Sequence, residues 1–257
     1  MISGLTTLQR TVSYSVRLGG ASESEGSHLA IRSDKGEVQM ATQVQARPTG
    51  ESQPTTKPQR GTMKTVVFHK YGPPEQLDLI DIETPVVEDD SVLVRVRAAS
   101  INALDWRFME GSPFVGRLMG MGFRKPKRNV PGVDLAGTVE AVGKNVTEFK
   151  PGDEVIGNRI NACAEYVLGL ERHFVLKPAR LTFEQAAAVP VAGMTALEAL
   201  QAAKIRPGQK VLVIGAAGGV GTFAVQLAKA FGADVTAVCS TRNVDMVRSI
   251  GADRVSG

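Results

Sequence analysis

A short glycine-rich stretch has the residue types needed to bind a phosphate. An apolar run at 211–214 is typical of a strand buried on both faces, and apolar residues recur at helical spacing over 220–231. The turn and the start of the helix contain Ala217, Gly218, Gly219, Val220 and Gly221. Glycines let a backbone approach a pyrophosphate closely, and the exposed N–H groups at a helix N-terminus bind the anion. We therefore predict that these residues bind a dinucleotide cofactor.

This stretch departs at one position from the dinucleotide-binding pattern G-x-G-x-x-G. Gly218 and Gly221 match the second and third glycines of the pattern, whereas Ala216 stands in place of the first. A second strand expected at 234–239 completes one β-α-β half of such a domain. The alternative is a glycine-rich turn that only packs a helix on a sheet and binds no ligand.

The residues after that second strand indicate which nucleotide is bound. A site for NAD usually has an acidic residue about 20 positions after the glycines, where it accepts a hydrogen bond from the ribose 2′-OH. This region instead contains Ser240, Thr241 and Arg242, whose hydroxyls and guanidinium suit a 2′-phosphate. We predict that NADPH is preferred over NADH. Alternatively, residues 240–243 only cap the helix expected to run to Ile250, and the two roles are compatible.

Composition narrows the class of protein. The chain has 257 residues, 43% of them hydrophobic, and a formal net charge of +4. The sequence contains no apolar run long enough to span a membrane and no basic stripe interleaved with aromatic residues. The cysteines, Cys163 and Cys239, each fall in an expected strand, and isolated thiols suit a reducing compartment. We expect a cytoplasmic protein with a small-molecule substrate and no membrane or nucleic-acid partner.

Three segments differ in their patterns. Residues 1–62 are rich in polar residues without sustained periodicity, so we expect a disordered extension; alternatively, the basic start of this segment is an organelle presequence. Residues 63–180 show short strands separated by turns, and a short helix starting at or near Asn102. Residues 181–257 alternate helices and strands. The expected strands in the middle segment are 65–69, 77–81, 91–99, 135–142, 154–157, 163–168 and 173–176.

The last segment has the pattern of half a dinucleotide-binding domain. A helix is expected at 192–203, ahead of the glycine-rich turn, and the sequence stops where a third strand would begin. We therefore expect 181–257 to be a truncated domain. Such a domain would expose a sheet edge and apolar surface, which predicts poor solubility.

Five strings of residues in this order resemble the medium-chain dehydrogenase/reductase superfamily, in its zinc-free branch similar to quinone oxidoreductases and zeta-crystallin. They are INALDW, VPGVDLAGTVEAVGKNVTEFKPGDEVIG, AEYV, AAAVPVAGMTALEAL and VLVIGAAGGVGTFAVQLAK. The resemblance covers residues 63–257. It implies an α/β plus β fold, in which a GroES-like β-barrel catalytic domain (63–180) precedes an incomplete Rossmann domain (181–257).

The resemblance also bears on metal binding. In zinc-dependent relatives, a cysteine and a His-Glu pair contribute to a catalytic zinc site, which needs such ligands in tetrahedral array. Here Asn102 stands at the first position and Val133-Asp134 at the pair, and the structural lobe with four cysteines is missing. We therefore expect no metal.

The resemblance places Asn102 and Asp105 near the nicotinamide and the substrate, and Thr195, at the start of its helix, beside the cofactor. Asn102 would then orient the substrate carbonyl or the cofactor. The alternative is that Asn102 only caps its helix, that Asp105 only favours the first helical turn, and that Thr195 is only a hydroxyl at a helix N-terminus.

The implied reaction needs few groups from the protein. Without a metal, reduction of a quinone or a polarised double bond requires a positioned nicotinamide and a donor to the developing oxyanion. The resemblance therefore implies an NADPH-dependent, zinc-independent oxidoreductase of quinones or α,β-unsaturated carbonyls, with a homodimer possible at full length. The alternatives are an enoyl-thioester reductase and a non-catalytic fragment that binds a nucleotide or a partner.

Overall fold

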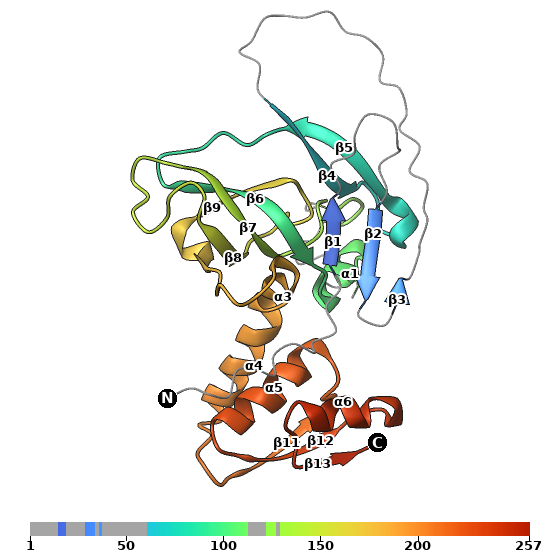
Figure 1. The fold of residues 1–257 in the computed structure, drawn as a ribbon. Helices are drawn as coiled ribbons and strands as arrows, with labels where there is room; N and C mark the ends of the chain where they lie inside the picture. Colours follow the sequence, from blue (N-terminus) through green and yellow to red (C-terminus); the bar gives the residue numbers. More distant parts are fainter. Residues whose placement is uncertain (1–14, 19–28, 34–35, 38–60, 113–121, 127–128) are drawn as a thin grey trace, which may run out of the picture. The chain divides into compact units, whose positions relative to one another are not determined.

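The computed structural model of the chain describes residues 15–18, 29–33, 36–37, 61–112, 122–126 and 129–257 (Figure 1). The chain divides into two compact units, of which one is Tyr14–Ala187 and the other contains Ala188–Gly257. The division lies a few residues after the expected boundary at 180/181. The reason is that α3 (Phe183–Ala187) packs through Ala186 and Ala187 into a core with strand residues of the first unit.

Antiparallel strands build the first unit. An eight-stranded sheet has the order β10-β8-β7-β6-β1-β2-β3, with β9 also paired to β6. β4 and β5 form a separate two-stranded sheet, and an isolated bridge joins Thr65 to Ala164. Among the described residues of this unit, the strands thus form two sheets rather than one closed barrel. The strands are β1 (Ser15–Leu18), β2 (Leu29–Ser33), β3 (Gly36–Glu37), β4 (Thr62–Phe68), β5 (Leu77–Glu83), β6 (Ser91–Ser100), β7 (Asp134–Val142), β8 (Glu154–Asn158), β9 (Tyr166–Leu170) and β10 (Phe174–Leu176).

Three short strands lie within the segment 1–62, for which we expected disorder. β1 pairs with β2, and Ser15 and Val16 of β1 also pair with Ser100 and Ala99 at the end of β6. Backbone pairing of this kind needs no apolar periodicity, so the sequence pattern did not indicate it. Most other residues of this segment lie outside the described part of the chain.

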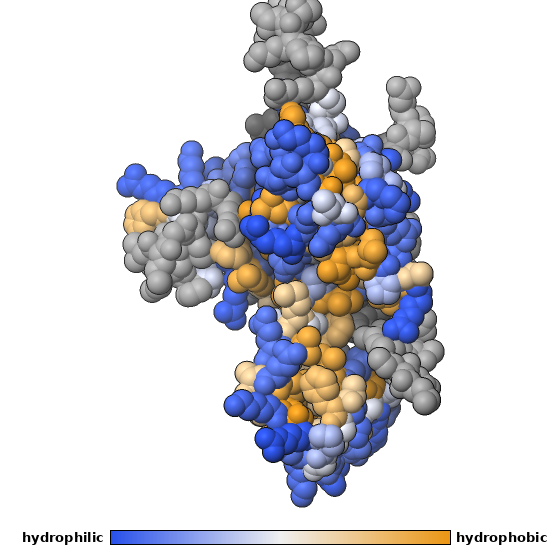
Figure 2. Space-filling model, turned by 90° about the vertical axis from the view of Figure 1, so that its left-hand side faces the viewer, coloured by the Kyte–Doolittle hydropathy of each residue, from blue (hydrophilic) through white to orange (hydrophobic). Residues whose placement is uncertain are grey.

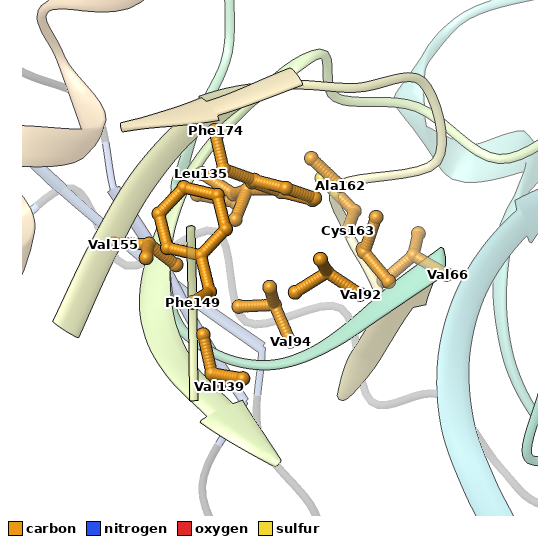
Figure 3. Packing of buried hydrophobic residues seen from close by; sticks show 12 residues of the cluster. Val66, Val92, Val94, Leu135, Val139, Phe149, Val155, Ala162, Cys163 and Phe174 are labelled. Atoms are coloured by element: carbon orange, nitrogen blue, oxygen red, sulfur yellow. The ribbon is translucent and has the colours of Figure 1, made fainter. Parts of the chain in front are cut away.

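The core of the first unit is made by alternate residues of its strands (Figure 3). Val92 and Val94 of β6 are fully buried while Arg95 and Arg97 are exposed, and Leu93 between the two valines is buried as well. Burial of each large apolar side chain contributes about 1.5–3 kcal/mol. The same cluster contains Val66, Ala99, Leu135, Val139, Phe149, Val155, Ala162, Cys163, Val167 and Phe174.

The second unit alternates helices with parallel strands. Its sheet has the order β11-β12-β13, and α4 packs against α5 through Ala192, Ala196 and Phe223. This arrangement confirms the β-α-β half expected for a dinucleotide-binding fold. The elements are α4 (Pro190–Ala202), β11 (Lys210–Ile214), α5 (Gly219–Ala230), β12 (Asp234–Val238), α6 (Val244–Ser249) and β13 (Arg254–Ser256).

One side of β11 carries exposed apolar groups. Val213 is buried in the core of the second unit, whereas Leu212 and Ile214 are 61% and 76% exposed. Hydrophobic residues also appear among hydrophilic ones on the face drawn in Figure 2. The expected exposed apolar surface is therefore present, and its effect on solubility stays a prediction. In the described part of the chain, none of the helices has the length and apolar character needed to cross a membrane.

Candidate functional site

The glycine-rich turn joins β11 to α5 at the carboxyl end of the parallel sheet. Gly215 has a φ of 75°, a left-handed conformation that glycine adopts without steric cost. The N–H groups of Gly215 and Ala216 donate to the carbonyl oxygen of Val238, at 2.9 and 3.0 Å. Gly218 is extended (φ −79°, ψ 168°), and α5 begins at the next residue. The structure thus confirms the predicted strand, turn and helix.

Two glycines at the start of α5 differ in their surroundings. A Cβ added to Gly221 would collide with the carbonyl oxygen of Gly215 and lie 2.8 Å from the Cα of Ala216. A Cβ on Gly219 would have its nearest neighbour, the Cβ of Ala192, at 3.8 Å. Gly221 therefore lets the helix pack closely on the turn, while the chain around Gly219 is open to a ligand.

The start of α5 has the donors that a pyrophosphate needs. Gly218, Gly219 and Val220 are exposed, and Val220 is 40% exposed. The first N–H groups of an α-helix have no acceptor within the helix and carry the positive end of its dipole. The residues present therefore fit the phosphates of a dinucleotide.

Ser240, Thr241 and Arg242 follow the neighbouring strand at the same edge of the sheet. β11 and β12 are parallel, with Ile214 opposite Val238, so the residues after both strands lie at the carboxyl edge where ligands bind in such folds. All three side chains are exposed. The Ser240 hydroxyl accepts a hydrogen bond from the side-chain amide of Asn243 at 3.0 Å and makes no capping bond to the short 3₁₀ helix Thr241–Asn243. α6, the helix expected to run to Ile250, likewise begins after Asn243 without a capping bond from that side chain, so the cap that we gave as an alternative role is not observed.

Thr195 lies deeper in its helix than expected. α4 begins at Pro190, and proline suits the first helical position because its φ is fixed near the helical value and its missing N–H is not needed there. Thr195 is exposed and belongs to the second turn. The expectation that it stands at the helix start is wrong, and its contact with a cofactor stays a prediction.

In the first unit, three polar residues meet at one edge of the large sheet. Ser100 ends β6, Asp134 begins β7 and Asn158 ends β8, and the strand register sets Asp134 opposite both of the others. The Ser100 hydroxyl donates to Oδ2 of Asp134 at 3.3 Å, and Nδ2 of Asn158 donates to Oδ1 at 3.4 Å. Asp134 has no exposed surface. Because a buried carboxylate is costly without donors, these contacts are what allows it at this position.

Asn102 joins this cluster from the start of α1 (Ala103–Glu110). It is the residue before the helix, which confirms the expected helix start. Its side-chain Nδ2 donates to Oδ2 of Asp134 at 3.0 Å, and its backbone N–H donates to Oδ2 of Asp105 at 2.7 Å. The structure therefore brings Asn102 and Asp105 together, and adds Asp134.

Asp105 is a buried carboxylate in the first turn of α1. Its Oδ1 accepts a hydrogen bond from the backbone N–H of Gly132 at 3.0 Å. Burial raises the pKa of Asp105, and the hydrogen bonds from Asn102 and Gly132 oppose this shift without cancelling it. These contacts fix the start of α1 to the loop before β7. A direct contact of Asp105 with substrate or cofactor stays a prediction.

Cys163 lies beside this loop as a packing residue. A Cβ on Gly132, which has a φ of 87°, would lie 2.8 Å from Sγ of Cys163. Burial, and next the charge of Asp105, raise the pKa of the Cys163 thiol to about 12. Within the residues that the structure describes, no group of three or more His, Cys, Asp or Glu side chains is arranged as a metal site.

Sequence reasoning did not select Ser100, Asp134 or Asn158 as site residues. A signal existed, because each lies one residue outside an expected strand (91–99, 135–142 and 154–157). The polar residue at each strand end was the available signal, and only the pairing of the three strands shows that these residues meet.

Comparison with known proteins agrees with this geometry. Residues 88–228 match the family of the alcohol dehydrogenase GroES-like domain. The chain is 36% identical over 206 residues to a chloroplast envelope quinone oxidoreductase homolog of Arabidopsis thaliana, covering 75% of this chain and 60% of that protein. It is 37% identical over 204 residues to an NADPH-dependent alkenal/one oxidoreductase of the same plant, covering 74% and 51%.

A solved structure shows the same fold. The crystal structure of the CurK enoyl reductase matches with a TM-score of 0.71 and 28% identity, covering 75% of this chain and 59% of that chain. The chain thus spans between half and three fifths of the length of the curated relatives described above.

Proposed function

Because the chain belongs to the medium-chain dehydrogenase/reductase superfamily, in its quinone-oxidoreductase-like branch, we propose that the whole protein is an NADPH-dependent, zinc-independent oxidoreductase. Its proposed substrates are quinones or α,β-unsaturated carbonyls, which are small molecules. The observation that carries the proposal is the open N-terminus of α5, with Ser240, Thr241 and Arg242 beside it at the carboxyl edge of the sheet. This combination suits a nucleotide that has a pyrophosphate and an extra phosphate.

A nicotinamide nucleotide, when bound, supplies the hydride for such a reduction. The chain's own contribution is to hold the nucleotide. Gly219 leaves room for the pyrophosphate, and Gly218 precedes it as the N-cap, near the first-turn N–H groups of α5, including those of Val220 and Gly221. Ala217 belongs to the same turn and contributes backbone only.

The proposed preference for NADPH rests on Arg242 together with two neighbouring hydroxyls. A guanidinium binds phosphate oxygens through charge-assisted hydrogen bonds, and the hydroxyls of Ser240 and Thr241 add donors. The name of the NADPH-dependent relative in Arabidopsis thaliana supports this preference. We also propose that the full-length protein forms a homodimer, while a cytoplasmic location stays a prediction.

The preference is tested by fluorescence titration of the purified chain with NADPH and with NADH. Arg242→Ala should weaken NADPH binding by about tenfold or more, as expected for a lost hydrogen bond to a charged group, and leave NADH binding unchanged. Arg248→Ala is the matched control, because Arg248 is an exposed arginine of α6 that pairs with Asp245 at 3.6 Å. Equal affinity of the unaltered chain for the two nucleotides would contradict the preference, and no binding of either would contradict the proposed nucleotide site at the start of α5.

An enoyl-thioester reductase is the second candidate, and the similarity to the CurK enoyl reductase favours it. The two candidates are separated by following NADPH oxidation with a panel of quinones, a simple enone and a crotonyl thioester. Faster turnover of the thioester would favour the second candidate. NADPH binding without turnover of any of them would favour the non-catalytic alternative.

A further inference from the structure

A groove on the second unit lies at the other end of the parallel strands from the glycine-rich turn. It is bounded by the end of α4, the connection that leads into β11 and the end of α5, and its volume is about 390 Å³. These segments stand at the amino ends of β11 and β12, whereas the proposed nucleotide site is at the carboxyl ends. The groove is lined by Leu200, Gln201, Lys204, Ile205, Pro207 and Phe231.

The lining of the groove is mostly apolar. Leu200 is buried, and Ile205 and Phe231 are half-buried. Of the lining residues, Gln201 and Lys204 have polar side chains, and both are exposed, so the groove is open to solvent. A peptide in this groove would set its backbone N–H and C=O groups against apolar side chains, which is unfavourable. An alkyl chain has no such groups, so the lining suits an alkyl chain better than a peptide.

Backbone contacts fix the shape of the groove. The N–H of Gly208 donates to the carbonyl oxygen of Gly232 at 2.8 Å, which joins the connection before β11 to the segment after α5. A Cβ added to Gly232 would lie 3.1 Å from the Cβ of Pro207, so the two segments are in close contact. Both glycines have left-handed φ values, 79° and 81°, which other residues adopt only with strain. The walls of the groove are therefore preformed.

Lys204 is the charged residue of the lining. It follows the end of α4 with a φ of 52°, a left-handed conformation that glycine usually provides at this place. A lysine there is strained, so the turn itself does not require it. None of the ion pairs found between described residues involves Lys204 or its exposed neighbour Arg206. The positive charge beside the groove is therefore available to an anion from outside the chain.

From the apolar lining and this available charge, we propose that the groove binds a medium-chain fatty acid. The alkyl chain lies against Leu200, Ile205 and Phe231, and the carboxylate contacts the ammonium group of Lys204. Charge complementarity selects an anion, and the apolar lining selects one that carries an alkyl chain. The groove is separate from the nucleotide site, so this inference does not depend on the proposed function.

The first test follows the isoleucine methyl groups by NMR while the chain is titrated with octanoate in its monomeric form. The signals are assigned by their loss in Ile205→Leu and Ile214→Leu. We expect a saturable shift at Ile205 and none at Ile214, which is 76% exposed at the carboxyl end of β11. Octanoate that binds any exposed apolar surface would shift both signals equally. That result, or the absence of a shift at Ile205, would overturn the proposal.

A ligand series separates the contribution of the chain from that of the carboxylate. Complete burial of one CH₂ group corresponds to about fourfold in affinity, so partial burial in an open groove predicts about twofold per CH₂ from butyrate to octanoate. Octanol lacks the charge and should bind about threefold more weakly, as expected for an exposed ion pair. Octylammonium should give no saturable shift. Binding of octanol or octylammonium as tightly as octanoate would overturn the proposal.

Lys204→Gly removes the cation without harm to the fold. Glycine adopts this φ without steric cost, so the thermal midpoint should stay the same or rise, while the affinity for octanoate should fall to that for octanol. Lys210→Gln is the matched control, because Lys210 is an exposed cation at the start of β11 that does not line the groove. It should leave octanoate binding unchanged. Unchanged affinity in Lys204→Gly, or an equal loss in Lys210→Gln, would overturn the proposal.

Discussion

The Asp105 carboxylate accepts a hydrogen bond of 3.0 Å from the backbone N–H of Gly132, and so ties the first turn of α1 to the loop that leads into β7. The same carboxylate accepts the N–H of Asn102 at 2.7 Å. One side chain therefore satisfies two backbone donors from different segments. Asp105 is 6% exposed, so water does not readily replace its carboxylate.

We predict that Asp105→Ala destabilises the first unit, because both backbone N–H groups lose their acceptor. A buried donor left without a partner costs about 1–3 kcal/mol. Asp105→Asn should cost less, since it keeps one acceptor oxygen. Urea unfolding followed by circular dichroism measures the change in free energy of unfolding. An unfolding midpoint of Asp105→Ala equal to that of the unaltered chain would contradict this role.

The two glycines of α5 give a matched pair of substitutions. Gly221→Ala places a Cβ against the Gly215 carbonyl oxygen and 2.8 Å from the Cα of Ala216, and both are backbone atoms that cannot move aside easily. Gly219→Ala places it 3.8 Å from its nearest neighbour. We expect Gly221→Ala to lower the thermal midpoint clearly, and Gly219→Ala to keep or raise it, because alanine favours the helix.

NADPH titration of the same pair separates packing from binding. If the space around Gly219 receives the pyrophosphate, Gly219→Ala should weaken NADPH binding in a chain that is fully folded. Unchanged affinity in this variant would mean that the phosphates do not approach Gly219, whatever happens with Gly221→Ala.

The two cysteines should differ in reactivity. Cys163 is 2% exposed, and a thiol with a pKa raised to about 12 stays protonated at about pH 8, where alkylation is usually carried out. Cys239 is partly exposed. We expect iodoacetamide to modify Cys239 in the folded chain, and both cysteines only after denaturation, as shown by mass spectrometry. Modification of Cys163 in folded Cys239→Ser would contradict the burial of this thiol.

Local patterns predicted most of the second unit. Apolar periodicity and the positions of the glycines predicted the strand, turn and helix around Gly218, because the conformation of these elements depends on residues close to them in the sequence. The start of α4 was missed by less than a turn, since Pro190 begins the helix ahead of the alanine-rich pattern. This small error moved Thr195 from the helix start into its second turn.

The polar cluster could not be predicted in the same way, because it depends on strand register. Ser100, Asp134 and Asn158 are far apart in sequence and meet only through pairing of β6, β7 and β8. Each residue stands at the end of a strand, and the ends of strands are the least reliable part of a prediction from sequence. The resemblance to a family drew attention to position 134 only as a missing zinc ligand. The contacts made by Asp134 required the structure.

The last prediction concerns an ion pair in the second unit, between Lys229 of α5 and Asp253. Asp253 lies before β13 and accepts hydrogen bonds from Nζ of Lys229, at 2.8 Å, and from the backbone N–H of Val235, at 2.6 Å. The Lys229 side chain first, and the Val235 N–H next, lower the pKa of Asp253 below its usual value of 3.8. The folded state therefore binds a proton at this carboxyl more weakly than the unfolded state does. The stabilisation by this carboxylate is therefore present at pH values above the pKa of Asp253 in the unfolded chain. It is lost as the pH falls through the pKa of Asp253 in the folded chain.

We therefore expect Asp253→Asn to lower the thermal midpoint at neutral pH, and the difference from the unaltered chain to shrink as the pH falls below 3.8. Asp245→Asn is the control, because Asp245 is fully exposed and pairs with Arg248 at 3.6 Å, a contact that should contribute little. Thermal unfolding of the three chains between neutral and acidic pH checks this. A difference for Asp253→Asn that stays constant down to the lowest pH would show that the carboxylate charge contributes nothing, and that the side chain stabilises the unit only through its shape.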